Sequence, residues 1–453
     1  MTIAQPPTSL SARLHAGSRT QPAATPVRIA LLGCGNIGSA LAQVLAQWTG
    51  AEVCAALVRT PGRARPVPAG TVVQSVQAVL DARPHIAVEC LGGVEFAAQA
   101  CYQLLDAGVH VVSANKSMVA NALPALSAAA QRTGAHLRFD AAVCAGVPVL
   151  DSLARLRPAR VRSVSGIVNG TCNVVLQGMA QRSQSQAEAL AEAVTAGYAE
   201  PDATADISGR DSAEKLCLLA AAAGLGAIHP LEVETHGIAH LDRAALADVR
   251  NLGGAVRLLA HVDAAGGAAP LVAPTVVPQS GPFARTTGTQ NLVRVQTDLA
   301  GTVTLSGPGA GANPTVAALL ADILACSAGQ SSWAEEPVSP AARSAAPAND
   351  RTSHADGCTS PASDRTSPAA ACAPPSTWLL RVPHEGRVLT PATLGPLLQA
   401  GGATWLGGSF LPGRALVQVR VASGTIRTVL EHVQAAGFPA QHLAVADDAA
   451  LWF

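Results

Sequence analysis

Charge and long apolar runs are both scarce in this chain, and each shortage excludes a class of partner. Charged residues make up 13% of the 453 residues, and 30 basic residues balance 30 acidic ones. Nucleic acids and acidic membrane surfaces select strongly basic faces, so neither is expected as the main partner. No apolar run reaches the ~18 residues that a membrane-spanning helix needs. We therefore expect no membrane partner and a cytoplasmic location.

Paired cysteines are also missing. The ten cysteines are scattered singly, with no CxxC pair and no Cys/His spacing typical of a zinc site. This pattern predicts reduced thiols in a cytosolic protein, many of them packed as small core residues.

Lysine is almost absent. Only Lys116 and Lys215 occur among the 30 basic residues, and the other 28 are arginine. An ammonium group is compact and can exchange a proton near neutral pH when it is desolvated, whereas guanidinium stays charged. In a chain that otherwise uses arginine, these two lysines indicate positions where proton exchange matters.

Length and apolar content predict two or three domains, since 453 residues with 49% hydrophobic content exceed one core. Strand patterns separated by helical segments predict a Rossmann-type doubly wound parallel sheet, a dinucleotide-binding domain over 27–150. Longer helices mixed with strands predict an α+β catalytic and dimerisation domain over 151–299. Residues 300–327 are predicted to return to the first domain. The predicted strands of the first sheet are 27–32, 53–58, 85–89, 110–113 and 136–139.

The remaining segments differ in composition. Residues 1–26 lack acidic residues and are rich in Ala, Pro, Ser, Thr and Arg, which predicts a disordered leader. Residues 328–375 contain Asp-Arg-Thr-Ser twice among Ser, Ala and Pro, which predicts a disordered linker. Residues 376–453 follow the order strand, helix, strand, strand, helix, strand, which predicts a ferredoxin-like βαββαβ unit.

A glycine pattern follows the first predicted strand. Gly33, Gly35 and Gly38, with Asn36 and Ile37 between them, form G-x-G-x-x-G between a strand and a helix. The glycines permit a tight turn, close approach to a pyrophosphate and helix–strand packing, and the helix N-terminus attracts the phosphate charge. In this context the pattern predicts a dinucleotide site rather than a purely structural turn.

The end of the second predicted strand bears on the choice of cofactor. A carboxylate there would bind a ribose 2′-hydroxyl, but the strand runs into Arg59 with further arginines behind it. Arginine suits a 2′-phosphate, which favours NADP without excluding NAD. A solvated surface loop is an equally good explanation of these arginines.

Three further segments carry the chemistry: 113–116 (Ser-Ala-Asn-Lys), 166–173 (Gly-Ile-Val-Asn-Gly-Thr-Cys-Asn) and 197–215. In the last, Asp211 and Lys215 are four residues apart and share one face of a predicted helix. A surface ion pair is the ordinary explanation of that spacing. The apolar run Leu216–Leu219 indicates a buried helix, however, and a buried lysine beside a carboxylate is suited to proton transfer.

Taken together, these segments resemble the homoserine dehydrogenase family over residues 27–327. The resemblance implies an NAD(P)-dependent enzyme that interconverts L-homoserine and L-aspartate 4-semialdehyde in threonine, methionine and isoleucine biosynthesis. It also implies a homodimer or homotetramer. Two other readings stay open: another Rossmann dehydrogenase of an amino-acid-derived aldehyde, and a non-catalytic dinucleotide-binding sensor.

The resemblance also implies residue roles. Lys215 would be the general acid–base, Asp211 would hydrogen-bond the substrate near its reacting hydroxyl, and Lys116 would lie by the nicotinamide. Glu200 would hold the substrate's α-ammonium, and Asp206 would support the site. Residues expected to line the substrate are Gly170, Thr171 and Asn173, and those expected to border the cofactor include Ser113, Asn115, Lys116, Gly309 and Gly311.

Two more features follow from the resemblance. The stretch 139–148 looks like the family's loop for a structural sodium ion, with the Asp140 carboxylate and the carbonyls of Val143, Ala145 and Val147 as ligands. Hard oxygen ligands suit such an ion, although Asp140 is one methylene shorter than the family's common glutamate. The C-terminal block occupies the place of an ACT-type regulatory domain but lacks the usual Asp-Pro-Gly effector turn, which argues against inhibition by threonine.

Overall fold

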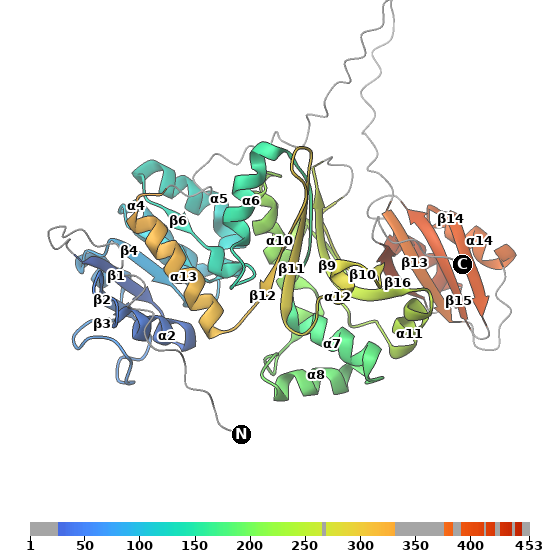
Figure 1. The fold of residues 1–453 in the computed structure, drawn as a ribbon, viewed down its shortest axis with the longest axis horizontal. Helices are drawn as coiled ribbons and strands as arrows, with labels where there is room; N and C mark the ends of the chain where they lie inside the picture. The colour runs from blue at the N-terminus through green and yellow to red at the C-terminus, as the bar shows by residue number, and fades with distance from the viewer. Residues whose placement is uncertain are drawn as a thin grey trace, which may run out of the picture.

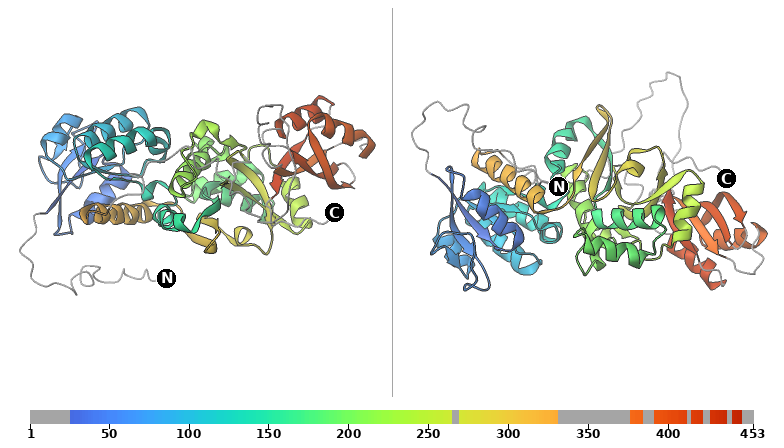
Figure 2. Two further views of the ribbon diagram at one scale, coloured as in Figure 1. Left: turned by 90° about the horizontal axis from the view of Figure 1, so that it is seen from above. Right: turned by 60° about the horizontal axis from the view of Figure 1, so that its bottom comes forward.

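The computed structural model describes residues 26–264, 269–330, 376–383, 391–411, 414–421, 426–436 and 440–445. Residues 1–25 of the predicted leader, most of the predicted linker and residues 384–387 at the position of the effector turn lie outside these ranges. Three bodies follow one another along the molecule (Figures 1 and 2), with the N-terminal sheet at one end and the C-terminal unit at the other. None of the described helices is both long and apolar enough to cross a membrane.

A six-stranded parallel sheet forms the first body, in the order β3-β2-β1-β4-β5-β6, which confirms the doubly wound prediction. Its strands are β1 (Val27–Leu32), β2 (Ala51–Leu57), β3 (Val72–Val73), β4 (Ile86–Glu89), β5 (His110–Ser113) and β6 (Leu137–Arg138). The connecting helices are α2 (Asn36–Leu45), α3 (Val76–Asp81), α4 (Glu95–Asp106) and α5 (Lys116–Thr133). Because helices cover both faces, apolar β1 is buried from Ile29 onward. Strand order reverses between β1 and β4, which opens a ligand crevice at their carboxyl ends.

The helix α13 (Ala312–Ser327) returns to this first sheet. Its residues Val316, Leu319 and Ile323 share one apolar cluster with Ile29 and Leu31 of β1. Figure 1 shows α13 lying across the helices and strands of the N-terminal body, although α13 is far from that body in the sequence.

The predicted start of this return, at residue 300, is wrong. Gly301–Pro308 forms β12, which pairs antiparallel with β11 (Gln290–Thr297) in a different sheet. The chain reverses at Asp298–Ala300, where the Thr297 hydroxyl accepts the Ala300 N–H at 2.9 Å. Residues 290–308 therefore form a hairpin of the second sheet, and the return begins only at α13.

The second sheet runs β12-β11-β7-β9-β10, with antiparallel neighbours. Its other strands are β7 (Val161–Ile167), β9 (Gly254–Asp263) and β10 (Leu271–Pro278), with β8 (Glu234–Thr235) beside β10. Helices of this body are α6 (Val149–Leu156), α7 (Gly170–Gln181), α8 (Gln186–Thr195), α9 (Thr204–Ile207), α10 (Arg210–Ala222), α11 (Arg243–Asn251) and α12 (Pro282–Arg285). The helices α7 and α10 pack on β9, and α10 also packs on α5 of the first body. Short 3-10 turns are η1 (Asp140–Ala142), η2 (Arg157–Ala159) and η3 (Pro230–Glu232).

The C-terminal unit has the predicted βαββαβ order and the ferredoxin-like strand order β16-β13-β15-β14. It comprises β13 (Ser376–Pro383), α14 (Pro391–Ala400), β14 (Ala403–Leu411), β15 (Arg414–Val421), α15 (Ile426–Ala435) and β16 (Gln441–Val445). The strand β16 pairs parallel with β10 at Thr275 and Val276, so the second sheet continues into this unit. His442 of β16 also contacts His236 and His240 of the middle body, which extends the junction beyond the strand pair.

Candidate active site

The glycine loop has the geometry that a dinucleotide pyrophosphate requires. Gly33 has φ +91°, and a Cβ there would lie 2.7 Å from the carbonyl oxygen of Cys90. A Cβ on Gly38 would lie 2.3 Å from the Gly33 carbonyl oxygen, so helix and loop can pack only without side chains. Nothing lies within 4 Å of a Cβ on Gly35, which leaves that approach open. No side chain caps the N-terminus of α2, so its N–H groups are available to an anion.

Arg59 lies just past the end of β2 and is exposed. The acidic residue of β2, Glu52, lies near the start of the strand and pairs with Arg28. No carboxylate therefore stands at the end of β2, where a ribose 2′-hydroxyl would be bound.

A buried carboxylate organises the ends of β4 and β5. Glu89 is completely buried and accepts hydrogen bonds from the Ser113 hydroxyl at 2.6 Å, the Leu91 N–H at 2.8 Å and the Asn115 amide at 3.3 Å. Burial raises the pKa of Glu89, and these hydrogen bonds oppose the rise. The Asn115 side chain also caps α5 at the Met118 N–H, 3.1 Å away. Sequence reasoning missed Glu89, whose only signal was an acidic residue ending an apolar strand.

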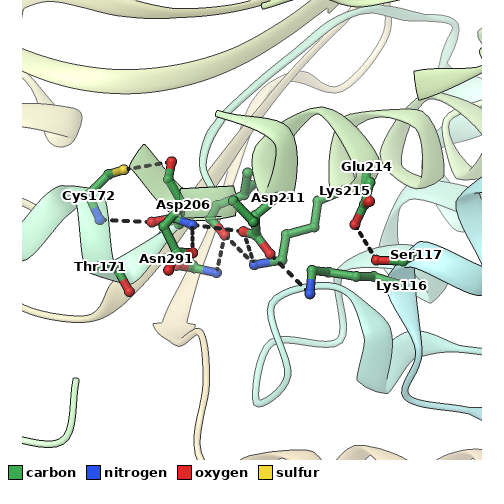
Figure 3. Close-up of polar contacts among 12 residues, drawn as sticks. Lys116, Ser117, Thr171, Cys172, Asp206, Asp211, Glu214, Lys215 and Asn291 are labelled. Carbon is green, nitrogen blue, oxygen red and sulfur yellow. Dashed lines mark hydrogen bonds and ion pairs between the residues drawn. The ribbon is translucent and has the colours of Figure 1, made fainter. Parts of the chain in front are cut away.

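The two lysines of the chain converge on one carboxylate (Figure 3). Lys116, the first residue of α5, places its Nζ 3.2 Å from Asp211 Oδ1. Lys215 places its Nζ 2.9 Å from Asp211 Oδ2 and donates to the Val168 carbonyl oxygen at 2.7 Å. The side chains of Asp211 and Lys215 are 9% and 13% exposed, whereas that of Lys116 is 35% exposed. The Asp211–Lys215 pair is thus buried, and Lys116 from the other domain contacts the same carboxylate. An ordinary surface ion pair has neither feature.

Opposing charge and burial set the proton affinities of this cluster. Burial would raise the pKa of Asp211, but the charges of Lys215 and Lys116 outweigh it and bring the pKa to about 2. Burial likewise lowers the pKa of Lys215, but Asp211 outweighs it, so the pKa lies above its ordinary value. The free protein therefore holds a carboxylate and an ammonium at neutral pH. Such an ammonium can donate a proton to a forming alkoxide.

Asn169 links the cluster to Asp206. Its amide donates to Asp206 Oδ1 at 2.6 Å and to Asp211 Oδ2 at 2.8 Å, and its Oδ1 accepts from the Cys172 N–H at 2.8 Å as the cap of α7. Burial raises the pKa of Asp206, and the hydrogen bond from Asn169 opposes this. Asn169 was quoted in the motif but not assigned to the site. An asparagine at a helix N-cap was the available signal.

Three residues expected to line the substrate contact neighbouring loops. Two of them donate side-chain hydrogen bonds to loop carbonyl oxygens, and the third packs closely against a loop. The Thr171 hydroxyl donates to the Tyr198 carbonyl oxygen at 3.2 Å. The Asn173 amide donates to the carbonyl oxygens of Thr286 at 3.2 Å and Gly288 at 2.9 Å. A Cβ on Gly170 would lie 3.0 Å from Thr289.

Glu200 is not brought to the cluster. It is exposed in the loop after α8, and among the described residues it makes no hydrogen bond or ion pair. The bond from Thr171 to Tyr198 ties this loop to the start of α7, so Glu200 lies two residues from a fixed point.

Gly309 and Gly311 lie between β12 and α13. A Cβ on Gly309 would lie 2.2 Å from the side-chain amide of Asn291, so glycine is required there by packing. The Asn291 amide in turn donates to the Val168 carbonyl oxygen at 3.4 Å, the acceptor that Lys215 also uses. Gly311 has φ +115° and is the N-cap residue of α13.

Asp140 is buried between α13 and α6. Its N–H donates to Asp322 at 3.0 Å, and its carboxylate accepts from the Leu150 N–H at 2.9 Å. Burial, and then the charge of Asp322, raise the pKa of Asp140 to about 8. Among the described residues, no cluster of three His, Cys, Asp or Glu side chains could hold a metal ion. The Val147 carbonyl oxygen already accepts from the Val149 N–H at 2.7 Å.

A doubly wound dinucleotide domain that faces a largely buried Lys–Asp pair and a second, partly exposed lysine is typical of nicotinamide-dependent dehydrogenases. The family model described as "Homoserine dehydrogenase, NAD binding domain" matches residues 33–140, and that described as "Homoserine dehydrogenase" matches 148–324. The chain belongs to the homoserine dehydrogenase family.

Individual relatives agree with this membership. The chain is 33% identical over 313 residues to the homoserine dehydrogenase of Neisseria gonorrhoeae, covering 66% of this chain and 72% of the relative. It is 34% identical over 314 residues to that of Synechocystis, with the same coverage. The crystal structure of the Thiobacillus denitrificans homoserine dehydrogenase is 26% identical, with a TM-score of 0.75 over 93% of this chain and 99% of that one. None of the described cysteines forms a disulfide.

Proposed function

We propose that this protein interconverts L-homoserine and L-aspartate 4-semialdehyde, a step of threonine, methionine and isoleucine biosynthesis, with NAD(P) as the hydride carrier. The observation that carries the proposal is the convergence of Lys116 and Lys215 on Asp211 at the boundary between the two domains. The test is spectrophotometric: purified protein with L-homoserine and each oxidised cofactor should generate reduced nicotinamide. No absorbance change with either cofactor would contradict the proposal.

Proton transfer is assigned to the lysine pair. The bound nicotinamide supplies or accepts the hydride. In the reducing direction the Lys215 ammonium donates its proton to the alkoxide oxygen as it forms, and in the oxidising direction neutral Lys215 removes that proton. Asp211 Oδ1 has two lone-pair sites and one is used by Lys116, so the other can accept the substrate hydroxyl. Lys116 adds a second positive charge beside the developing alkoxide.

Substrate binding is assigned to Glu200. Because Glu200 makes no bond to another described residue, its carboxylate is available to the substrate's α-ammonium. We expect Glu200→Gln to raise the KM for homoserine by roughly 5–30-fold, because weakening a charge-assisted hydrogen bond costs about 1–2 kcal/mol. Steady-state kinetics should show kcat nearly unchanged. The exposed Glu192 of α8 gives a control, Glu192→Gln, that should leave KM alone. A collapsed kcat with an unchanged KM in Glu200→Gln would mean that the role is wrong.

NADP is proposed as the preferred cofactor, because Arg59 follows β2 and no carboxylate stands there. The location is proposed to be the cytoplasm. Ser113, Asn115 and the loop of Gly309 and Gly311 are proposed to border the nicotinamide half.

A sodium ion is proposed at Asp140, with the carbonyls of Val143, Ala145 and Val147. The pKa of the buried Asp140 carboxyl is raised to about 8, because the protein alone stabilises its negative charge poorly. A bound cation would balance that charge. We expect sodium chloride to raise Tm above that in equimolar choline chloride, and Asp140→Asn to remove the difference. Because the folded pKa is raised, the sodium effect should grow as pH rises toward 8. Equal Tm values in both salts at high pH would exclude this ion.

Assembly is proposed to be a homodimer or homotetramer. The outer strand β12 lies at an open end of the second sheet and alternates exposed with half-buried residues, so its backbone groups can pair with another copy. At the other end, the C-terminal unit is proposed to be ACT-like and to serve assembly, since β16 extends β10. Light scattering of the purified chain tests the oligomeric state.

A further inference from the structure

A second contact between α5 and α10 lies directly beside the lysine cluster. The Ser117 hydroxyl donates to Glu214 Oε2 at 2.6 Å (Figure 3). Ser117 follows Lys116 in the first turn of α5, and Glu214 precedes Lys215 in α10. The two residues are 97 positions apart and come from the two different domains.

The Lys116–Asp211 and Ser117–Glu214 contacts lie side by side between α5 and α10. Asp211 and Glu214 are three residues apart, so they project from the same face of α10 toward the start of α5. Lys116 meets Asp211 and Ser117 meets Glu214. Both carboxylates also lie near the N-terminus of α5, where negative charge is favoured.

The Glu214 contact is built as a buried, charge-assisted bond. Glu214 is 8% exposed, and among the described residues Ser117 is the partner of its side chain. A carboxylate out of water makes a short, strong hydrogen bond with a hydroxyl and is costly when left unpaired. The bond therefore resists separation of α5 from α10, whereas the Lys116–Asp211 contact is partly exposed and longer.

We propose that Ser117 and Glu214 are a positioning pair that holds the dinucleotide domain against the catalytic helix. The nicotinamide would be carried by the first domain and the substrate by the second, so their approach depends on this boundary. The pair also fixes the first turn of α5 and so holds Lys116 on Asp211. A small misplacement at such a boundary can slow a reaction by about 100-fold without touching the reacting atoms. This inference rests on the proposed dehydrogenase function.

The test compares Ser117→Ala, Glu214→Gln, their double variant and Ser117→Thr, which keeps the hydroxyl. The matched control is Ser185→Ala, because the Ser185 hydroxyl lies 2.8 Å from Glu188 Oε2 on α8, away from the domain boundary. Each protein is assayed for kcat, KM, Tm and the kinetic isotope effect with homoserine deuterated at its carbinol carbon. Wild-type turnover in the same assay tests the proposed function separately.

We expect Ser117→Ala and Glu214→Gln each to lower kcat roughly 10-fold, with the double variant no worse than the worse single, since neighbours in one contact are non-additive. The isotope effect should increase as hydride transfer becomes limiting. Ser117→Thr should restore kcat, and Ser185→Ala should change Tm but neither kcat nor the isotope effect. Should Ser117→Ala fail to fold, Glu214→Asp, which shortens the side chain but keeps the charge, should still lower kcat.

The inference is overturned if the wild type is active and the Ser117 and Glu214 variants keep its kcat. It is equally overturned if kcat falls only in proportion to the folded fraction while the isotope effect stays constant. An inactive wild type would instead refute the proposed function.

Discussion

Replacing Lys215 by methionine is expected to lower turnover by about 10²–10⁴-fold, the usual contribution of a general acid–base group. Methionine keeps much of the apolar stem among its buried neighbours but cannot exchange a proton. Lys215 contacts Asp211 and the Val168 carbonyl oxygen, and neither belongs to the glycine loop, so cofactor affinity should be unchanged. Turnover in both directions and calorimetric titration with cofactor measure the two effects.

Lys215→Arg is the matched control for charge. Arginine keeps the positive charge but not the exchangeable proton near neutral pH, so it should be nearly as slow as methionine. A Lys215→Met protein with close to wild-type turnover would remove Lys215 from the proton step.

The pH dependence of the wild type follows from the same group. Burial lowers the pKa of Lys215, but Asp211 outweighs it, so the net pKa is raised. The ammonium form therefore persists through neutral pH. Reduction of the semialdehyde should be flat around neutrality and fall only in alkali, whereas oxidation of homoserine should accelerate as pH rises toward that pKa.

Asp211→Asn is expected to be nearly as damaging, with turnover lowered roughly 100-fold or more, because a charge that orders two lysines is lost. Without the carboxylate, the effect of burial on Lys215 is opposed much less, so the pKa of Lys215 falls. The alkaline rise in homoserine oxidation should then move to lower pH. A full pH–rate profile of wild type and variant measures this shift.

Asp206→Asn provides the comparison for this variant. Asp206 hydrogen-bonds Asn169 but makes no ion pair with either lysine within the described residues, so its profile should move much less. An Asp211→Asn profile that kept the wild-type alkaline rise would contradict the assigned coupling.

Acid stability gives a separate reading of Asp211. Its folded pKa is depressed from the ordinary 3.8 to about 2, so its stabilising contribution is fully present above about pH 4. That contribution should be lost as pH falls toward 2. The difference in free energy of unfolding between wild type and Asp211→Asn should therefore shrink as the pH falls below 4.

Local patterns in the sequence predicted the parts of the site that depend on neighbours in the chain. The glycine loop, the strand alternation and the spacing of Asp211 and Lys215 each follow from short-range geometry. The rarity of lysine also identified Lys116 before its partner was known. The glycine loop and the spacing of Asp211 and Lys215 need only a few consecutive residues, whereas the rarity of lysine is a count over the whole chain.

Contacts between distant segments could not be predicted in this way. Glu89 reads as the polar end of an apolar strand until Ser113 and Asn115 are seen to bond to it. Ser117 and Glu214 carry no local signal at all, since each is an ordinary polar residue in a helix. The hairpin of β11 and β12 was missed because β-branched and apolar residues continue on both sides of its turn.

Direct hydride transfer from homoserine is tested by incubating the protein with oxidised cofactor and L-homoserine fully deuterated at its carbinol carbon. In the wild type we expect one deuterium at C4 of the reduced nicotinamide and the other in the semialdehyde. In Lys215→Met both labelled products should form much more slowly. Mass spectrometry of both products reads the label. Reduced cofactor without deuterium, or deuterium released to water, would contradict oxidation of this substrate by direct hydride transfer at the lysine cluster.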